Sequence, residues 1–259
     1  MTKLILALQG DSAARAKSMF KQTEGWIDVY KIGIDLFTHT GNRLVKYFIN
    51  HEAKVFLDLK FCDIPSVVAK ASEICARLRV SMFTIHTMGG FEMMKMCADS
   101  LKEFCYKKRI KSRPLILGVT ILTSISNKAF NELWGIKQRT DIKVHVARLA
   151  QLAKSAGLDG VICAGHEITA IKKKCGKDFL TVVPGIRIPT STEETQEGTK
   201  VVNDDQSRAF TPAEASRAGA DYIVVGRPII RAPEPIAVIE KIREDIEKGY
   251  QGVKNVSGH

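Results

Sequence analysis

A short segment of the chain carries two carboxylates and one ammonium group at spacings that could bring them together. Asp58 and Lys60 flank one leucine at the end of an apolar run, and Asp63 follows three residues after the lysine. Side chains alternate along a β-strand, so Asp58 and Lys60 are expected on one side and Leu57 and Leu59 on the other. Charged groups crowded in this way shift each other's pKa values and can place a fixed cation beside a reacting group. The alternative interpretation is a structural ion pair at the end of a strand.

Short apolar runs, each followed by a stretch with helical spacing, must position these groups. This alternation predicts βα units around a parallel sheet. The expected strands are Leu4–Leu8, Val29–Gly33, Val55–Leu59, Met82–His86, Leu115–Val119, Gly160–Cys163, Leu180–Val183 and Tyr222–Gly226. Eight units suit closure, so the sequence predicts an α/β fold, a single (β/α)₈ TIM barrel. The third strand would then end at the barrel mouth, where reactive groups of such barrels gather.

Helix signals between these runs support the same arrangement. The segment Thr211–Glu214 has the residue types of a capping box with proline in the first turn, and Gly219 is suited to end that helix. Two apolar stripes at helical spacing predict further helices. They are Val144, Leu149, Leu152 and Ala156 in one helix, and Ile236, Ile239, Ile242 and Ile246 in the last one.

Domain organisation is expected to be simple. No linker or change in composition divides the chain, so residues 1–259 should form one domain, with a flexible tail from about residue 250 to residue 259. The longest polar stretch, Pro189–Ser207, is expected to be a loop. Loops of this length inside a compact domain are usually functional or disordered.

Composition is that of an ordinary globular protein, with 259 residues, 28.7 kDa, 45% apolar and 26% charged residues. No apolar segment is long enough for a signal peptide or a membrane span, so a soluble cytoplasmic protein is expected. The six cysteines form no CxxC pair. This argues against a zinc site and a disulfide framework, and predicts reduced and mostly buried thiols.

An excess of basic residues gives the chain a formal net charge of +11. Such a charge can attract nucleic acid, anionic lipid or a phosphorylated small molecule. The densest basic runs are Lys107–Arg109, followed by Lys111 and Arg113, and Lys172–Lys174. Neither run belongs to a nucleic-acid-binding motif, and solvated surface is expected for both. No nucleic-acid or membrane partner is therefore predicted.

The segment Asp58–Pro65, which reads DLKFCDIP, closely resembles the DxKxxDIP signature of the orotidine 5′-monophosphate decarboxylase family. Further segments resemble motifs of the bacterial members in the same order along nearly the whole chain. They are Tyr30–Gly33, His86–Gly90, Val119–Ser124, Val161–Glu167, Pro184–Arg187, Asp205–Arg208, Thr211–Ala215 and Val225–Pro228. Each segment alone is a moderate signal, and all of them in register are a strong one.

The resemblance implies decarboxylation of orotidine 5′-monophosphate to UMP, the last step of de novo pyrimidine nucleotide synthesis, with neither cofactor nor metal. Loss of CO₂ leaves negative charge on the ring, and a preorganised cation stabilises charge where it develops. By this resemblance Lys60 supplies the cation and then the proton, while Asp58 lies beside the departing carboxylate and holds Lys60. Asp63 comes from the partner subunit in this family, which implies a homodimer with shared active sites.

Substrate-binding residues are carried over by the same resemblance. Arg227 is the best candidate for binding the 5′-phosphate because a guanidinium binds phosphate in a bidentate way. Gly226 has no side chain, so the backbone there can approach the phosphate closely. Other matching positions are Arg187 and Gln206 for the phosphate, Thr123 for the pyrimidine edge and Lys31 for the ribose. His86 matches a position that contacts either the ribose or a residue next to the ligand. Without the resemblance, His86 is expected to be a structural histidine at a strand end.

Three features depart from the family pattern. Gln9 follows the first strand where the family usually has a ribose-binding aspartate, and Val67 replaces a threonine four residues after Asp63. The loop between Arg187 and Gln206 is longer than in bacterial members. These changes concern ribose binding and loop closure, and they leave the segment from Asp58 to Asp63 intact.

Two other functions remain open. Mg²⁺-dependent sugar-phosphate enzymes of the same barrel group, such as 3-keto-gulonate-6-phosphate decarboxylase and hexulose-6-phosphate synthase, also use an Asp-x-Lys-x-x-Asp array. The segments Ile64–Pro65, Leu122–Ser124 and Asp205–Gln206 favour the pyrimidine enzyme. A non-catalytic protein that uses its positive charge to bind nucleic acid is the second alternative, and no motif supports it.

Overall fold

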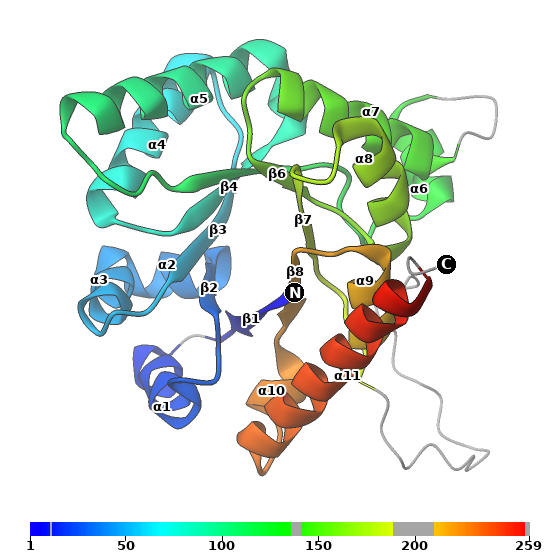
Figure 1. Ribbon diagram of the computed structural model, residues 1–259. Helices are drawn as coiled ribbons and strands as arrows, with labels where there is room; N and C mark the ends of the chain where they lie inside the picture. Colours follow the sequence, from blue (N-terminus) through cyan, green and yellow to red (C-terminus); the bar gives the residue numbers. More distant parts are fainter. Residues whose placement is uncertain (11, 136–140, 189–209, 257–259) are drawn as a thin grey trace.

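Parallel strands form a closed barrel with helices packed around it in this computed structural model (Figure 1). Residues 1–10, 12–135, 141–188 and 210–256 are described. The strands are β1 (Lys3–Leu8), β2 (Val29–Gly33), β3 (Val55–Phe61), β4 (Met82–His86), β5 (Leu115–Val119), β6 (Gly160–Ile162), β7 (Leu180–Val183) and β8 (Tyr222–Val225). Each strand pairs with the next along the chain and β8 pairs with β1, which confirms the predicted (β/α)₈ barrel.

Helices connect successive strands on the outside of the barrel, and two more follow the last strand. They are α1 (Ala13–Thr23), α2 (Ile34–Thr40), α3 (Asn42–Asn50), α4 (Pro65–Leu78), α5 (Gly90–Lys107), α6 (Asn127–Leu133), α7 (Ile142–Ser155), α8 (Ile168–Cys175), α9 (Pro212–Ala218), α10 (Arg227–Ile230) and α11 (Pro235–Val256), with 3₁₀ turns η1 (Thr87–Gly89) and η2 (Gly165–Glu167). The capping box of α9 is confirmed, because Thr211 accepts the Glu214 N–H and the Glu214 carboxylate accepts the Thr211 N–H. Gly219 ends α9 in the left-handed conformation, as predicted.

The third strand is longer than predicted. It continues past Leu59 to Phe61, and its pairing with β4 shifts register between Leu57 and Phe61. Lys60, within this stretch, has a φ of 53°, which is uncommon for a residue with a β-carbon. The strand therefore contains a bulge-like irregularity here, and such features often re-aim a side chain next to an active site.

The apolar core consists of two clusters, one inside the barrel and one between the strands and the helices. The interior cluster consists of Ile5, Ala7, Val29, Phe56, Met82, Leu117, Val182, Tyr222 and Val224. Leu57 belongs to the outer cluster and Leu59 packs against it. Alternation therefore turns Asp58 inward on the same side as Phe56, as the sequence predicts.

Three aspartates organise the end of the barrel at which the strands begin. Asp28, Asp159 and Asp221 each directly precede a strand. Their carboxylates accept N–H groups of the neighbouring strand, from Leu4 at 2.8 Å, Ile116 at 2.7 Å and Thr181 at 2.7 Å. Each carboxylate also pairs with a basic side chain, of Arg243, Arg113 and Lys172 respectively. These contacts stabilise the strand starts and leave the opposite end free for binding.

The predicted burial of α7 is wrong in part. Val144 is 68% exposed, whereas Ile142, Val146, Ala150 and Ala153 form the buried face. Leu149 and Leu152 pack at the edge of this face, and Ala156 is buried as predicted. The helix begins at Ile142, and spacing counted from that residue gives the observed face.

Lys172 also differs from its expected place on a solvated surface. Its side chain is 15% exposed and its ammonium donates to Asp221 Oδ2 at 2.6 Å and to the backbone oxygens of Lys177 and Phe179. Lys173 and Lys174 are exposed, as predicted. A long lysine stem can cross an apolar layer to reach a carboxylate, which explains the difference.

Helix α11 continues through the region expected to be a flexible tail, as far as Val256. Gly249 lies against α9, because a β-carbon there would be 2.2 Å from the Ala213 carbonyl oxygen. This close approach brings the end of α11 onto α9, so the helix extends past residue 250. The predicted stripe is confirmed, with Ile239, Ile242 and Ile246 buried.

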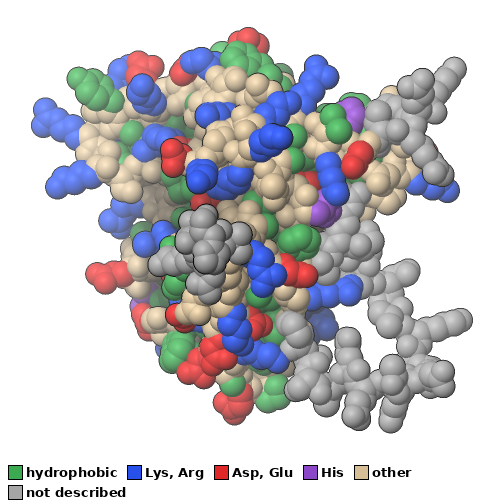
Figure 2. Space-filling model, turned by 45° about the vertical axis from the view of Figure 1, so that its right-hand side comes forward, with side chains coloured by type: hydrophobic (Ala, Val, Ile, Leu, Met, Phe, Trp, Pro, Cys, Tyr) green, Lys and Arg blue, Asp and Glu red, His purple; other side chains and the backbone are tan. Residues whose placement is uncertain are grey.

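Charged side chains are spread over the surface. Figure 2 shows Lys and Arg scattered across the visible face with Asp and Glu between them. In the described part of the chain, no helix combines the length and the apolar character that crossing a bilayer requires. All six cysteines are free thiols, and only Cys62 is exposed.

Candidate active site

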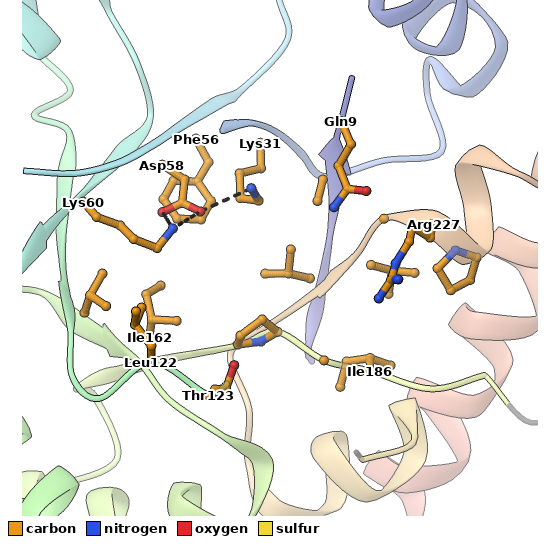
Figure 3. A pocket seen from close by; sticks show the side chains of 18 of the residues that line it. Gln9, Lys31, Phe56, Asp58, Lys60, Leu122, Thr123, Ile162, Ile186 and Arg227 are labelled. Atoms are coloured by element: carbon orange, nitrogen blue, oxygen red, sulfur yellow. Dashed lines mark hydrogen bonds and ion pairs between the residues drawn. The ribbon is translucent and has the colours of Figure 1, made fainter. Parts of the chain in front are cut away.

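A cavity of about 280 Å³ opens at the carboxyl ends of the strands (Figure 3). Several residues predicted for the site line it. Among the described residues they are Gln9, Lys31, Asp58, Lys60, Thr123, Gly226 and Arg227. They come from the ends of β1, β2, β3 and β8 and from the segment after β5. Closure of the barrel therefore brings distant parts of the sequence to one cavity.

The Asp58 carboxylate lies between two ammonium groups. Lys60 Nζ donates to both carboxylate oxygens at 2.9 Å, and Lys31 Nζ lies 3.2 Å from Asp58 Oδ2 (Figure 3). The side chains of Asp58 and Lys31 are 11% and 15% exposed, whereas that of Lys60 is 38% exposed. One carboxylate thus faces two ammonium groups, so the three side chains together carry a net positive charge beside the cavity.

The charge state of Asp58 follows from this environment. Burial by itself raises the pKa of the Asp58 carboxyl, because a charged group loses water. The ammonium groups of Lys31 and Lys60, with hydrogen bonds from Lys60 and Thr84, outweigh burial and hold this pKa below its ordinary value of 3.8. Asp58 is therefore ionised at neutral pH.

Strand register brings Lys31 to Asp58. In the pairing of β2 with β3, Lys31 lies opposite Phe56 and Gly33 lies opposite Asp58. A long side chain can reach the diagonal position on the next strand. A β-carbon on Gly33 would lie 3.2 Å from Lys31 Nζ, so the glycine leaves the space that the ammonium group uses.

Thr84 of β4 joins the bulge in β3 to the charged cluster. The Lys60 N–H donates to Thr84 Oγ1 at 2.9 Å, and the Thr84 hydroxyl donates to Asp58 Oδ1 at 3.0 Å. The residues predicted for the site did not include Thr84. The sequence did contain a signal for it, because alternation along this apolar strand places the polar Thr84 on the same inward side as Met82 and His86.

A further cation lies across the cavity from this cluster. Arg227 follows β8 and lines the same cavity, with Gln9 beside it (Figure 3). A β-carbon on Gly226 would lie 3.2 Å from the Ala7 carbonyl oxygen and 3.6 Å from Gln9 Nε2. The close approach of β8 to β1 therefore places the Gln9 amide next to this glycine.

Apolar side chains line the cavity between its two cationic parts. They include Phe56, Val119, Leu122, Ile162 and Ile186, and Thr123 adds a hydroxyl group. Apolar walls with few polar groups are typical of small-molecule sites, where the polar groups fix the orientation of the ligand. This arrangement suits a flat ring that carries an anionic group on either side.

Three of the predicted residues that the structure describes do not line this cavity. Asp63 is exposed on the loop after β3, where its carboxylate accepts the Ile64 N–H at 2.6 Å. Arg187 is exposed directly after Ile186, and its N–H donates to the Phe210 carbonyl at 2.9 Å. His86 ends β4, and Gln206 lies outside the described residues, as does most of the long polar stretch.

His86 has a structural contact of its own. Its Nδ1 accepts the Met88 N–H at 3.3 Å and so caps the 3₁₀ turn η1. Burial lowers the pKa of the His86 imidazole, and the positive charge of Lys60 lowers it further. His86 is therefore neutral at pH 7, and its contact with ribose stays a prediction.

The donor groups of this site favour an anion over a metal ion. Within the described ranges, no three His, Cys, Asp or Glu side chains gather as metal ligands do. Both oxygens of Asp58 already accept from ammonium groups. A divalent cation there would have to compete with two lysines.

Comparisons with known proteins agree on one family. Residues 2–242 match the family described as "Orotidine 5′-phosphate decarboxylase / HUMPS family". An orotidine 5′-phosphate decarboxylase of Legionella pneumophila (strain Lens) is 41% identical over 94% of this chain and 99% of its own length. A relative of the same name from Syntrophotalea carbinolica is 41% identical over 94% of both chains.

A solved structure shows the same likeness. The orotidine 5′-phosphate decarboxylase from Lactobacillus acidophilus superposes with a TM-score of 0.78 at 32% identity, covering 95% of this chain and 99% of that one. The names of these relatives favour orotidylate decarboxylation over the Mg²⁺-dependent sugar-phosphate alternative. These similarities show that the chain, with its closed barrel and its cavity, belongs to the orotidine 5′-phosphate decarboxylase family.

Proposed function

We propose that this protein decarboxylates orotidine 5′-monophosphate to UMP without a cofactor. The observation that carries the proposal is the position of the Lys60 ammonium. Asp58 holds it beside a cavity with both polar and apolar walls, and another cation, Arg227, lies across that cavity. Orotidylate has a flat pyrimidine with a carboxylate on one side and a ribose phosphate on the other, which matches this distribution. Membership of the family supports the same reaction.

Lys60 is the residue to which we assign the chemistry. The bond between C6 of the pyrimidine and the carboxylate carbon breaks, CO₂ leaves, and the electron pair stays on C6. The Lys60 ammonium lies where it can stabilise this charge and then transfer one proton to C6, which leaves a neutral amine. Electrostatic stabilisation by a preorganised cation needs no reorganisation during the step and can be the largest catalytic contribution.

Asp58 has two proposed roles. Its carboxylate fixes the Lys60 ammonium through two hydrogen bonds of 2.9 Å. Because the pKa of the Asp58 carboxyl is lowered, it stays charged and repels a substrate carboxylate bound next to it. Departure of CO₂ removes that repulsion, so the interaction favours the transition state over the bound substrate.

Phosphate binding is assigned to the Arg227 side of the cavity. The guanidinium can form two parallel hydrogen bonds to phosphate oxygens, and Gly226 has no side chain to obstruct them. Arg187 and Gln206 remain predicted phosphate contacts. Gln9 next to Gly226 can hydrogen-bond a ribose hydroxyl, and Lys31 and His86 remain predicted ribose neighbours. Thr123 is assigned to the pyrimidine edge.

We further propose a homodimer in which Asp63 enters the site of the partner subunit. Several large apolar side chains are exposed after the ends of the adjacent strands β3, β4 and β5, and Asp63 follows the first of these strands. They are Ile64, Val67, Met88, Phe91 and Leu122. Exposed apolar surface of this kind marks interaction sites, and a partner seated there would bring its own Asp63 close to the mouth.

We also expect the enzyme to act in the cytoplasm and without a nucleic-acid partner. Six free thiols suit a reducing compartment. The interspersed charges of the visible face resemble a solvated surface more than a continuous basic track.

The first test is turnover of orotidylate by the chelator-treated protein, followed by ultraviolet absorbance. We expect activity in the wild type, and a loss of about a thousandfold or more in kcat for Lys60→Ala, because the charge at C6 loses its cation. Lys174→Ala, a change at an exposed lysine of α8, should leave turnover unchanged. Full activity in Lys60→Ala contradicts the assignment, and dependence of the wild type on Mg²⁺ favours the sugar-phosphate alternative.

The second test is the pH dependence of stability in Asp58→Asn. At pH 7 the variant leaves two lysines without their carboxylate, so we expect the free energy of unfolding to fall by about 1–3 kcal/mol. The lowered pKa means that Asp58 stabilises the fold above its unfolded pKa and loses this effect as the pH falls through the folded value. The difference from wild type should therefore shrink in the acid range below 3.8.

Urea denaturation at several pH values measures this difference. Asp99→Asn, which breaks an exposed pair with Lys95, is the matched control and should cost about 1 kcal/mol or less at any pH. A constant difference between wild type and Asp58→Asn down to the acid limit of folding contradicts the charge assignment.

The third test is complementation between two inactive variants, Lys60→Ala and Asp63→Ala. If sites are shared, a hybrid dimer has one doubly altered site and one intact site. An equimolar mixture, unfolded and refolded together, should then recover about a quarter of wild-type activity, because roughly half of the dimers are hybrids. No recovery, with hybrid dimers shown to be present, means that Asp63 acts within its own subunit.

A further inference from the structure

We propose that Thr84 is a positioning residue for the reaction, which holds the Asp58 carboxylate and the Lys60 backbone in one geometry. This inference rests on the proposed function. Thr84 is fully buried, and it is not one of the described residues that line the cavity. It therefore acts through its neighbours and not on the substrate.

The hydroxyl group of Thr84 has a fixed direction. A hydroxyl has one proton to donate and accepts through its lone pairs. The Lys60 N–H donates to Thr84 Oγ1 at 2.9 Å, so a lone pair is used there. The single proton is then directed to Asp58 Oδ1, 3.0 Å away. Thr84 thus joins the backbone of the proton donor to the carboxylate that holds its ammonium.

Lys60 needs this contact because its backbone has left the regular ladder. The register of β3 against β4 shifts between Leu57 and Phe61, and Lys60 has a φ of 53°. A bulge leaves a backbone group without its ladder partner, and a left-handed conformation persists only where the surroundings enforce it. Thr84 supplies the missing acceptor from the adjacent strand.

The same hydroxyl determines how Asp58 faces the two lysines. Asp58 Oδ1 accepts from Thr84 and Lys60, whereas Oδ2 accepts from Lys60 and forms an ion pair with Lys31. Loss of the Thr84 proton leaves Oδ1 with Lys60 alone, and the carboxylate can then rotate toward Lys31. Lys60 would lose both its backbone anchor and the orientation of its ammonium group.

The test compares the kinetics of Thr84→Val with those of Thr84→Ser. Valine has nearly the shape of threonine but no hydroxyl, so we expect kcat for orotidylate to fall about ten- to a hundredfold, with KM changed less than about threefold. Serine keeps the hydroxyl, so kcat should stay within about threefold of wild type. Removing a hydrogen bond to the charged carboxylate raises its pKa, so the acid limb of the pH profile should move to higher pH in Thr84→Val only.

Thr181→Val is the matched control. Thr181 is also a fully buried strand threonine whose hydroxyl donates to an aspartate, Asp221, which pairs with a lysine. It lies at the opposite end of the barrel, so Thr181→Val should reduce stability and leave kcat and the pH profile unchanged. Should Thr84→Val fail to fold, Thr84→Ala removes the same hydroxyl and takes its place.

Wild-type kcat and an unmoved acid limb in Thr84→Val overturn the inference, and so does an equal loss of kcat in Thr181→Val. If the wild-type protein does not turn over orotidylate at all, the proposed function fails instead. The role of Thr84 is then decided by ¹³C NMR of the Asp58 carboxyl, whose pKa must be higher in Thr84→Val than in wild type and unchanged in Thr84→Ser.

Discussion

A carboxylate removed from water must be compensated by charge and hydrogen bonds, and the Asp58 carboxylate meets this requirement with two lysines and a threonine. The lysines come from adjacent parallel strands, and Gly33 leaves the space for one of them. The result is a charged carboxylate with an excess of one positive charge next to the cavity. The proposed chemistry depends on the Lys60 ammonium that this carboxylate holds.

The two ends of the barrel use similar residues for different purposes. At the end where strands begin, each of three aspartates pairs with one basic side chain and accepts a backbone N–H group. Charge and hydrogen bonding are balanced there, which stabilises the fold. At the opposite end Asp58 faces two lysines, and the left-handed backbone of Lys60 adds a conformational cost of about 1–3 kcal/mol. Strain of this size is typical of functional sites.

Much of the barrel and of its central cluster could be predicted from the sequence, because both depend on periodicity. Alternation placed Asp58 inward and Leu57 outward, and the apolar runs located the strands. The contact of Lys31 with Asp58 could not be derived in this way, since it depends on the register between β2 and β3. The resemblance implies a ribose contact for Lys31, which stays a prediction, and the structure adds its ion pair with Asp58.

Other features depend on information that side-chain patterns do not contain. The positive φ of Lys60 lies where β3 shifts its register against β4, and a lysine, unlike a glycine, gives no sequence signal of such a backbone angle. The burial of Lys172 and the continuation of α11 to Val256 both follow from packing between elements distant in sequence. Periodicity within one segment cannot report such contacts.

The most direct test of the charge balance at Asp58 is the titration of its carboxyl in the wild-type protein by ¹³C NMR. We expect an Asp58 carboxyl that is ionised at neutral pH and whose midpoint lies below its ordinary value of 3.8, because two ammonium groups outweigh burial. A midpoint above that value would mean that burial outweighs the two ammonium groups, which contradicts the charge balance assigned to Asp58. A midpoint above neutral pH would in addition leave Lys60 without an anionic partner.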